Sequence, residues 1–169
     1  MRRKLVAGNW KLHGTRQFAT ALMDELVAGL PLEGVDLLVL PPLPYLGELI
    51  EDYGDRGVAF GAQDVSSNEQ GAYTGEVSAS MLVDVGARYG LCGHSERRQY
   101  HNETSDLVAR KFRAALNAGL RPVLCVGERL EQRDAGQAAE VIASPLQPVL
   151  ELVGGRGAAH ARRASEPVR

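Results

Sequence analysis

Short apolar runs alternate along the chain with longer stretches in which apolar residues recur at the spacing of an amphipathic helix. The runs predict strands at residues 5–8, 35–40, 58–62, 89–93 and 122–126. Strands that alternate with helices are typical of βαβ units, in which helices pack against a sheet of parallel strands. The pattern therefore predicts an α/β fold.

The stretches between these runs predict helices at residues 43–50, 79–85, 106–118 and 136–153, besides one that begins after Thr15. Thr15, Ser78 and Ser105 can each cap the helix that follows, and Gly119 can end the third of the capped helices. The first helix is expected to bury an apolar face made of Phe18, Leu22, Leu26 and Val27.

Three segments depart from this alternation. The polar, Gly-rich stretch 63–77 is longer than most strand-to-helix connections. Pro145 and Pro148 are expected to interrupt the last helix. The tail from residue 154 carries His160, Arg162 and Arg163 where a sixth buried strand is expected. We therefore expect 154–169 to be a degraded sixth strand that need not be ordered, within a single domain spanning 1–169.

The composition of the chain mainly excludes classes of protein and of partner. The chain has 169 residues, of which 44% are hydrophobic and 24% charged, as in one soluble globular domain. A net charge of −2 without a long basic run argues against nucleic acid as a partner. No apolar run approaches the roughly 20 residues of a membrane span, and no secretory apolar region follows the basic start.

The positions of the cysteines and histidines bear on the compartment of the protein and on whether it binds a metal. Cys92 and Cys125 lie in apolar runs and form no C-x-x-C pair, which indicates buried, reduced thiols in a cytoplasmic protein. The four histidines lack the spacing of metal ligands. We expect His13, His101 and His160 at the surface, because none has a convergent partner in the sequence.

Polar residues follow the predicted strands at the ends that hold active sites in parallel α/β folds. These residues are Asn9, Lys11, Gln63, Asp64, His94 and Glu128. An amide, an ammonium and an imidazole converging on one face would suit proton transfer beside a carbonyl whose oxygen becomes negative.

His94 leads from a strand directly into a predicted helical turn. The dipole and N–H donors of a helix N-terminus disfavour a cationic imidazole there, so a neutral ring could donate a hydrogen bond to a substrate oxygen. A histidine that simply satisfies a helix cap is an equally good interpretation. Lys11 could supply positive charge for an anionic substrate, although a solvated loop lysine is the commoner meaning of this pattern.

The remaining candidates have structural alternatives that the residues favour. Glu96 could be an acid–base group, but an ion pair with Arg97, Arg98 or Lys11 is the better interpretation. For Glu128 we expect structural pairing with Arg133, and for Asn9 a role in a turn is open.

Five blocks of sequence resemble those of one enzyme family, in its order and at its spacing. They are Ala7–Lys11, Gly61–Val65, Gly71–Ser78, Gly93–Arg98 and Cys125–Glu128. Together they resemble triosephosphate isomerase from the N-terminus to about Val153. The resemblance implies a (β/α)8 TIM barrel and interconversion of dihydroxyacetone phosphate with D-glyceraldehyde 3-phosphate through an enediolate, in glycolysis and gluconeogenesis. It implies no cofactor and no metal.

The resemblance also implies a role for each matching residue. Lys11 would stabilise negative charge and, with Asn9, bind substrate, while His94 would be the electrophile on the carbonyl oxygen. Glu96 would hold Lys11 in place, and Ser95 would cap the helix. The block Ala164–Arg169 places Glu166 where the family has its catalytic base, which moves a proton between adjacent substrate carbons.

The family is expected to be homodimeric. The stretch 63–77 would then be the arm that inserts into the partner subunit, carrying Thr74, Gly75 and Glu76. Thr74 would lie near the partner subunit's Lys11 and the partner subunit's His94. This role explains a loop that is unusually long for a monomer.

The chain departs from the family's pattern at its end. A (β/α)8 barrel typically takes about 250 residues, so these 169 residues predict an incomplete barrel of about five to six βα units. The lid, strands seven and eight and the phosphate-binding loops are missing. Ser165 and Arg169 replace the family's Tyr and Trp. Such a barrel would expose the edges of strands one and six.

The stretch 154–163, rich in Gly, Ala and Arg, resembles out-of-frame reading of GC-rich DNA. We hypothesise a truncated or mis-framed product that is weakly active or inactive alone. A genuine stop codon, with no coding for strands seven and eight in any downstream frame, would contradict this. An inactive fragment that keeps only dimerisation through 63–77 is the alternative. The block Gly93–Arg98 argues against a different sugar-phosphate isomerase.

Overall fold

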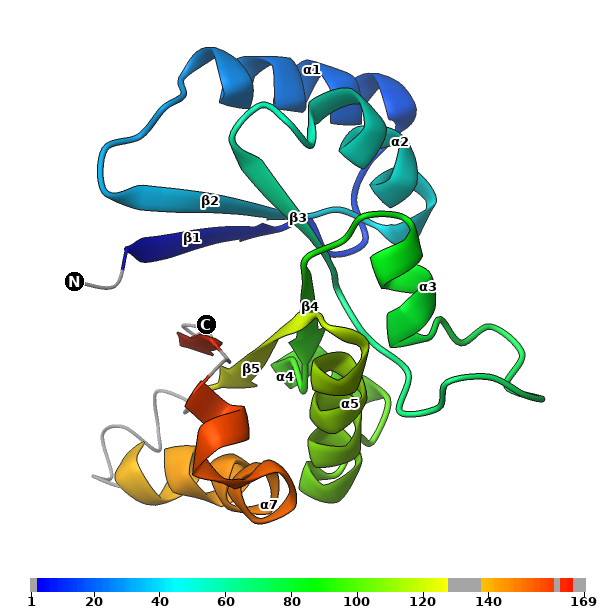
Figure 1. Ribbon diagram of the computed structural model, residues 1–169, viewed down its shortest axis with the longest axis vertical. Helices are drawn as coiled ribbons and strands as arrows, with labels where there is room; N and C mark the ends of the chain where they lie inside the picture. Colours follow the sequence, from blue (N-terminus) through cyan, green and yellow to red (C-terminus); the bar gives the residue numbers. More distant parts are fainter. Residues whose placement is uncertain (1–2, 128–137, 160–161, 166–169) are drawn as a thin grey trace. The chain divides into compact units, whose positions relative to one another are not determined.

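The computed structural model describes residues 3–127, 138–159 and 162–165 of the chain (Figure 1). Its strands are β1 (Lys4–Asn9), β2 (Val35–Leu40), β3 (Val58–Ala62), β4 (Tyr89–Cys92), β5 (Arg121–Val126) and β6 (Arg162–Ser165). Its helices are α1 (Arg16–Ala28), α2 (Leu43–Tyr53), α3 (Ala79–Asp84), α4 (Ser95–Tyr100), α5 (Ser105–Ala118) and α7 (Ala138–Ala159). The predicted alternation of strands and helices is therefore confirmed.

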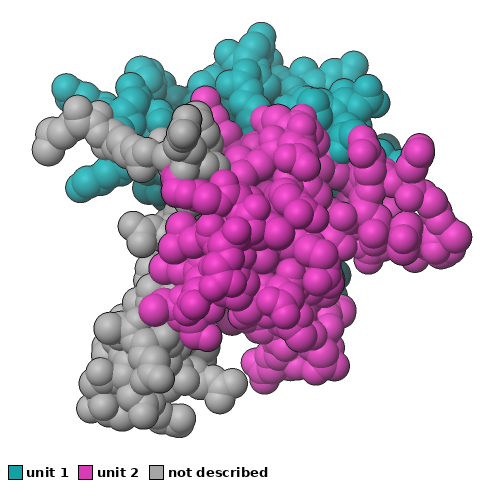
Figure 2. Space-filling view, turned by 60° about the horizontal axis from the view of Figure 1, so that its bottom comes forward, with its two compact units in different colours: residues 1–63, 80–89 teal, residues 64–79, 90–169 magenta. Residues whose placement is uncertain are grey.

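The chain divides into two compact units (Figure 2). Unit 1 comprises residues 1–63 and 80–89, and unit 2 comprises residues 64–79 and 90–169. In unit 1, β1 pairs in parallel with β2 from Lys4↔Val35 to Asn9↔Leu40, and β2 pairs in parallel with β3. In unit 2, β5 pairs in parallel with β6. Parallel strands joined by helices are what the sequence pattern predicts.

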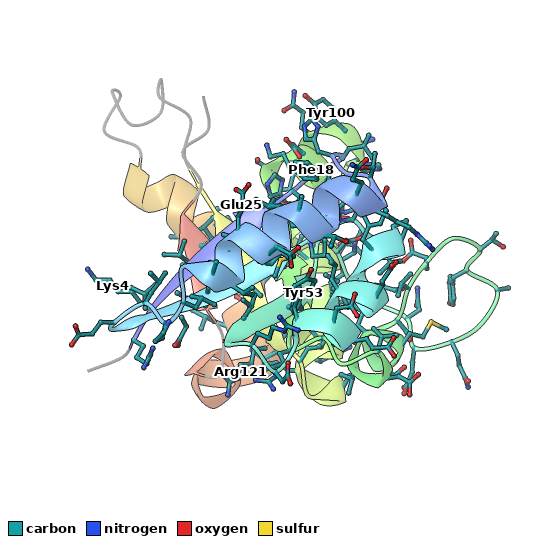
Figure 3. All side chains as sticks on the ribbon, turned by 90° about the horizontal axis from the view of Figure 1, so that it is seen from above. Lys4, Phe18, Glu25, Tyr53, Tyr100 and Arg121 are labelled. Carbon is teal, nitrogen blue, oxygen red and sulfur yellow. The ribbon has the colours of Figure 1, made fainter. Side chains whose placement is uncertain are left out.

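Helices α1 and α2 cover one side of the strands of unit 1 (Figure 1). Met23, Leu38 and Leu46 are fully buried in this layer. Of the predicted face of α1, Leu22, Leu26 and Val27 are half-buried beside the buried Ala19 and Met23, whereas Phe18, labelled in Figure 3, is 47% exposed. The ring of Phe18 instead forms a T-shaped pair with Trp10, with 5.7 Å between ring centroids. The contact with Trp10 gives this exposed aromatic residue a neighbour that periodicity does not identify.

The core of unit 2 lies between its strands and the helices α5 and α7. Its buried members are Cys92, Val108, Ala109, Phe112, Leu124, Val126 and Val149. Both cysteines are free and buried, as expected from their apolar surroundings. Burial raises the pKa of the Cys92 thiol far above its usual range, so this group is held as an unreactive thiol.

Several helix boundaries differ from the prediction. Thr104, not Ser105, caps α5, since its hydroxyl accepts the N–H of Leu107 at 3.2 Å. Helix α2 continues to Tyr53, beyond the predicted end at residue 50. Pro145 and Pro148 lie inside α7, whose non-helical residue is Gly154, with φ 68°. Gly119 ends α5 in the left-handed region as predicted.

Within the segment 154–169 the structure describes the short strand β6, while the expectation that the segment as a whole is degraded stays a prediction. β6 pairs with β5 from Val123↔Arg162 to Val126↔Ser165. Ladder hydrogen bonds join backbone groups, so Arg162 and Arg163 do not prevent the pairing. The extent of one domain over 1–169 stays a prediction. Among the helices described, none is long and apolar enough to cross a membrane.

Candidate functional site

The turn after β1 is fixed by hydrogen bonds from two sides. The side-chain Oδ1 of Asn9 accepts the backbone N–H of Lys11 at 3.0 Å. The side-chain Nε2 of Gln63 donates to the carbonyl of Lys11 at 3.0 Å and to the carbonyl of Leu40 at 2.9 Å. These bonds hold Lys11 in the left-handed region, with φ 53°. Asn9 therefore does act as a turn residue, and what it fixes is the backbone of Lys11.

The segment that follows this turn is tied to helices α1 and α2. Tyr45 of α2 donates its hydroxyl to the carbonyl of Gly14 at 3.1 Å. A Cβ on Gly14 would lie 3.0 Å from the Tyr45 ring, so glycine permits the close approach. Thr15 caps α1 by accepting the N–H of Phe18 at 3.1 Å. The backbone around Lys11 is consequently well supported on both sides.

His94 occupies the junction between β4 and α4, where it is buried. It is the N-cap of α4, and its ring Nδ1 accepts the backbone N–H of Glu96 at 3.2 Å. A nitrogen that accepts carries no proton, so the ring is the neutral tautomer protonated at Nε2. The expectation that Ser95 caps this helix is wrong, because the cap is one residue earlier and Ser95 is the first helical residue.

Glu96 lies beside the same ring. One carboxylate oxygen, Oε2, is 3.6 Å from Nδ1 of His94. This separation is too long for a hydrogen bond, and Nδ1 is already occupied by the amide of Glu96. Whether Glu96 also holds Lys11 stays a prediction. Its neighbour Arg97 pairs with Glu103 at 2.5 Å and with Asp64 at 3.1 Å.

Asp64, Arg97, Glu103 and Lys111 form a buried charge network in unit 2. Nζ of Lys111 contacts both oxygens of Asp64 at 2.8 Å and Oε1 of Glu103 at 2.6 Å. Lys111 is 4% exposed, and the side chain of Glu103 is 2% exposed. The network holds the segment around Asp64, helix α4 and helix α5 together.

The two carboxyls of this network differ in pKa. Burial raises the pKa of Asp64 above its usual value, against the opposing hydrogen bond from Lys111. Burial also acts to raise the pKa of Glu103, but hydrogen bonds from Lys111 and Arg97 outweigh it, so the pKa is lowered. Glu103 is therefore the carboxylate that the two cations hold ionised.

Sequence reasoning missed both Glu103 and Lys111. The one available signal is that Lys111 falls within the apolar stripe of α5, between Val108 and Ala115. A lysine there has to find buried partners. Its partner Asp64 is 47 residues away in the sequence, so periodicity cannot identify the pair.

Arg98, which the sequence suggested only as a possible ion-pair partner of Glu96, makes two side-chain hydrogen bonds to other groups. Its Nε donates to the carbonyl of Gly93 at 3.0 Å, and its Nη1 donates to Oγ of Ser105 at 3.2 Å. Burial lowers the pKa of this guanidinium. Because an arginine starts from so high a pKa, the group nevertheless stays charged.

The loop predicted as a dimer arm is a long excursion between β3 and α3 (Figure 1). Its base is closed by the N–H of Ser66, which donates to the carbonyl of Val77 at 2.9 Å. Near its end the N–H of Glu76 donates to the carbonyl of Tyr73 at 3.0 Å, enclosing Thr74 and Gly75 in a turn. Gly75 has φ 88°, and all of 69–76 is exposed. The arm is thus a defined turn rather than a featureless linker.

Some predicted residues lie outside the described part of the chain. These are Glu166, His160, and the pair Glu128 and Arg133. In the described ranges, no group of three or more His, Cys, Asp or Glu side chains is arranged to hold a metal ion.

Comparison with known proteins gives one consistent family. The family model described as triosephosphate isomerase matches residues 4–169. A triosephosphate isomerase of Stenotrophomonas maltophilia strain R551-3 is 75% identical over 168 residues, covering 99% of this chain and 67% of the relative. The proteins of that name from Xanthomonas campestris pv. campestris strain 8004 and Xanthomonas oryzae pv. oryzae strain PXO99A are 70% and 69% identical over the same coverage. The chain spans about two thirds of the length of these curated relatives.

Proposed function

The chain belongs to the triosephosphate isomerase family, with the α/β fold of an incomplete TIM barrel, and we propose that it carries the groups that polarise the substrate in triose phosphate isomerisation. The reaction interconverts dihydroxyacetone phosphate and D-glyceraldehyde 3-phosphate. A proton leaves the carbon beside the carbonyl, an enediolate forms, and a proton returns to the neighbouring carbon. The groups required are a base, a hydrogen-bond donor to the oxygens and a positive charge.

His94 is the proposed donor, and its bond with Glu96 is the observation that carries the proposal. Because the N–H of Glu96 occupies Nδ1, the imidazole proton resides on Nε2. A neutral N–H of this kind can donate to the substrate carbonyl and to the enediolate oxygen that replaces it. The ring is buried and placed by a helix cap, so little reorganisation is needed when charge develops.

Lys11 is the proposed source of positive charge. Its backbone is fixed by Asn9 and Gln63, which favours a defined starting point for its flexible side chain. An ammonium near the reacting atoms would stabilise both the phosphate-bearing substrate and the enediolate. Asn9 is proposed to bind substrate besides fixing this turn. Glu166 is the proposed base, on the resemblance of its sequence block alone.

We propose further that the 169 residues alone turn over triose phosphate weakly or not at all, because the matched relatives are about half as long again. The test is a fusion of this chain to the remaining third of the Stenotrophomonas maltophilia relative. A coupled assay should detect isomerase activity in the fusion, and the fusion with His94→Gln should lose it. A folded, dimeric fusion without turnover would contradict the proposal.

The second candidate function is self-association through residues 63–77. The defined, exposed turn around Thr74 supports it, since a turn of this kind can insert into a partner. Under either function we propose a homodimer in the cytoplasm, and the active isomerase would serve glycolysis and gluconeogenesis. Analytical ultracentrifugation of the chain, and of a variant with residues 70–76 replaced by a short Gly-Ser link, tests this. A soluble, inactive dimer that becomes monomeric in the variant would favour the second function. A wild-type monomer would contradict it.

A further inference from the structure

We infer that Arg98 is a positioning residue for His94, acting through the carbonyl of Gly93 to hold the imidazole in its capping orientation. What His94 does chemically rests on the proposed function, whereas the orientation that Arg98 holds can be measured without any activity. The residues involved all belong to unit 2, at the junction of β4, α4 and α5.

The orientation of the imidazole depends on the peptide group between Gly93 and His94. Nε of Arg98 donates to the carbonyl of Gly93 at 3.0 Å, and that carbonyl is bonded directly to the nitrogen of His94. The backbone N–H of Arg98 in turn donates to the carbonyl of His94 at 3.1 Å. The carbonyl of His94 also accepts the backbone N–H of Arg97 at 2.9 Å, so the bond to Gly93 is the contribution that depends on the Arg98 side chain. Rotation of either peptide group that flanks His94 would change the direction of the imidazole.

The guanidinium is itself anchored on the far side. Its Nη1 donates to Oγ of Ser105, the first residue of α5. The planar fork of an arginine lets one side chain bridge two acceptors at fixed angles. Helix α5 is packed through Val108 and Phe112, which are fully buried. Arg98 thus links the turn that carries His94 to a well-packed helix, and this link restricts the movement of the turn.

Helix α4 cannot supply this rigidity itself. It has six residues, none of them buried. Helices of this length are marginal without tertiary contacts. The capping bond between His94 and Glu96 needs the first turn of α4 to be in place, so the anchors of α4 also decide the orientation of the ring.

Gly93 provides the space that the bond requires. Its φ is 72°, and an added Cβ would lie 2.7 Å from Cγ1 of Val108 and 2.9 Å from Nη2 of Arg98. A side chain at residue 93 would therefore press on Val108 and on the guanidinium of Arg98, and glycine leaves that space to them. A close, directional contact such as the bond from Arg98 to Gly93 is a better positioning device than a long ion pair across solvent.

The partial burial of Arg98, complete at its Nη2 atom, has a cost that its hydrogen bonds do not fully offset. Nη2 is buried and has no hydrogen-bond partner among the described residues. Leaving a buried donor unsatisfied is unfavourable, most of all on a charged group. Arg97 shows the contrast, because it pairs with Glu103 and Asp64 in the charge network. Arg97 fits a structural role, and Arg98 fits a role in orienting the turn.

The test is nitrogen-15 NMR of the histidine side chains in this chain, with His94 assigned by comparison with His94→Gln. An unprotonated ring nitrogen resonates well apart from a protonated one, so the signals report which nitrogen carries the proton. The wild type should show an unprotonated Nδ1 at His94. In Arg98→Met we expect the two ring nitrogens to average towards intermediate values as the capping bond is lost.

Two control variants distinguish a change in the orientation of His94 from a general loss of stability of the fold. Arg97→Gln breaks the ion pair with Glu103 and should lower stability while leaving the His94 signals unchanged. Ser105→Ala removes the anchor but keeps the bond to Gly93, so a smaller change is expected. If Arg98→Met fails to fold, Arg98→Lys is measured in its place, since lysine can make one of the two bonds. Unchanged His94 signals in the folded Arg98 variant would overturn the inference.

The fusion described above adds a kinetic readout. Arg98→Lys should lower kcat by about 10²-fold with little change in KM, as expected for a small displacement of a catalytic group. An inactive wild-type fusion would contradict the proposed function and leave the NMR measurement to decide the role of Arg98.

Discussion

The backbone N–H of Glu96 donates to ring nitrogen Nδ1 of His94 at 3.2 Å, and this bond determines which ring nitrogen is protonated. The same contact caps α4 and prepares the imidazole to donate from Nε2. The two interpretations that the sequence left open, a cap and an electrophile, are therefore compatible at one residue. The cap of α4 and the position of the proton on His94 therefore depend on the same hydrogen bond.

Replacement of Gly93 tests how tightly the turn before His94 is packed. Gly93→Ala should destabilise by about 1–2 kcal/mol for its left-handed backbone and about 1–3 kcal/mol more for the contact with Val108. Gly34→Ala is a matched control, because Gly34 has φ 71° with nothing within 4 Å of an added Cβ. Urea unfolding followed by circular dichroism measures both. Equal losses at the two glycines would contradict the packing argument.

Removal of Lys111 tests the buried charge network. Lys111→Met should destabilise by about 3–5 kcal/mol at neutral pH, because Asp64 and Glu103 lose their shared cation. Arg110→Met is the control, since Arg110 is exposed on the same helix. Its unfolding free energy should change little, within about 0.5 kcal/mol.

The pH dependence of this effect has a defined sign. In the wild type the pKa of Glu103 is lowered, so its contribution to stability is present above its unfolded pKa and is lost as pH falls through the folded value. Without Lys111 the carboxyls bind protons more readily. The gap between variant and wild type should therefore narrow as pH falls through the unfolded pKa of these carboxyls, about pH 4. A gap that widens on acidification would contradict the assignment.

Tyr53 joins α2 to α1 by donating its hydroxyl to Oδ1 of Asp24 at 2.8 Å. Burial, then the hydrogen bond to Asp24, raises the pKa of Tyr53. Its stabilising contribution is therefore present below its unfolded pKa and is lost as pH rises through the folded one. Tyr53→Phe should cost about 1 kcal/mol at neutral pH and reduce the loss of stability in alkali.

Urea unfolding at neutral and alkaline pH measures this difference. Tyr100→Phe is the control, because Tyr100 is 69% exposed (Figure 3). It should match the wild type at both pH values. Alkaline sensitivity that persists in Tyr53→Phe would show that another group is responsible.

Replacement of Thr15 tests the cap of α1, and the expected change in stability is small. Thr15→Ala should lower stability by about 1 kcal/mol, because the N–H of Phe18 loses its acceptor. Thr15→Ser keeps an acceptor and should stay close to the wild type. Trp10 is the one tryptophan of the chain and contacts Phe18, so its fluorescence reports unfolding at this place. Indistinguishable Ala and Ser variants would argue against the cap.

The sequence pattern placed the strands well because buried parallel strands are continuous apolar runs. Residues 35–40 and 58–62 form β2 and β3 with the predicted bounds. The sequence pattern predicted the buried faces and the caps of the helices less well. Phe18 lies outside the buried face of α1, and Thr104 takes the capping position that Ser105 was expected to fill. Two adjacent hydroxyl residues are equally good caps in isolation, so docking of the helix decides between them.

By itself, the sequence determined the order of strands and helices, the family, and the residues at the strand ends, since local hydrophobic pattern and short motifs encode these. Tertiary structure alone decided the tautomer of His94, the pairing of Lys111 with Asp64, and the bond from Arg98 to Gly93. The physical reason is the same in each case. A hydrogen bond or ion pair depends on distance and direction between groups, and these exist only after the chain has folded.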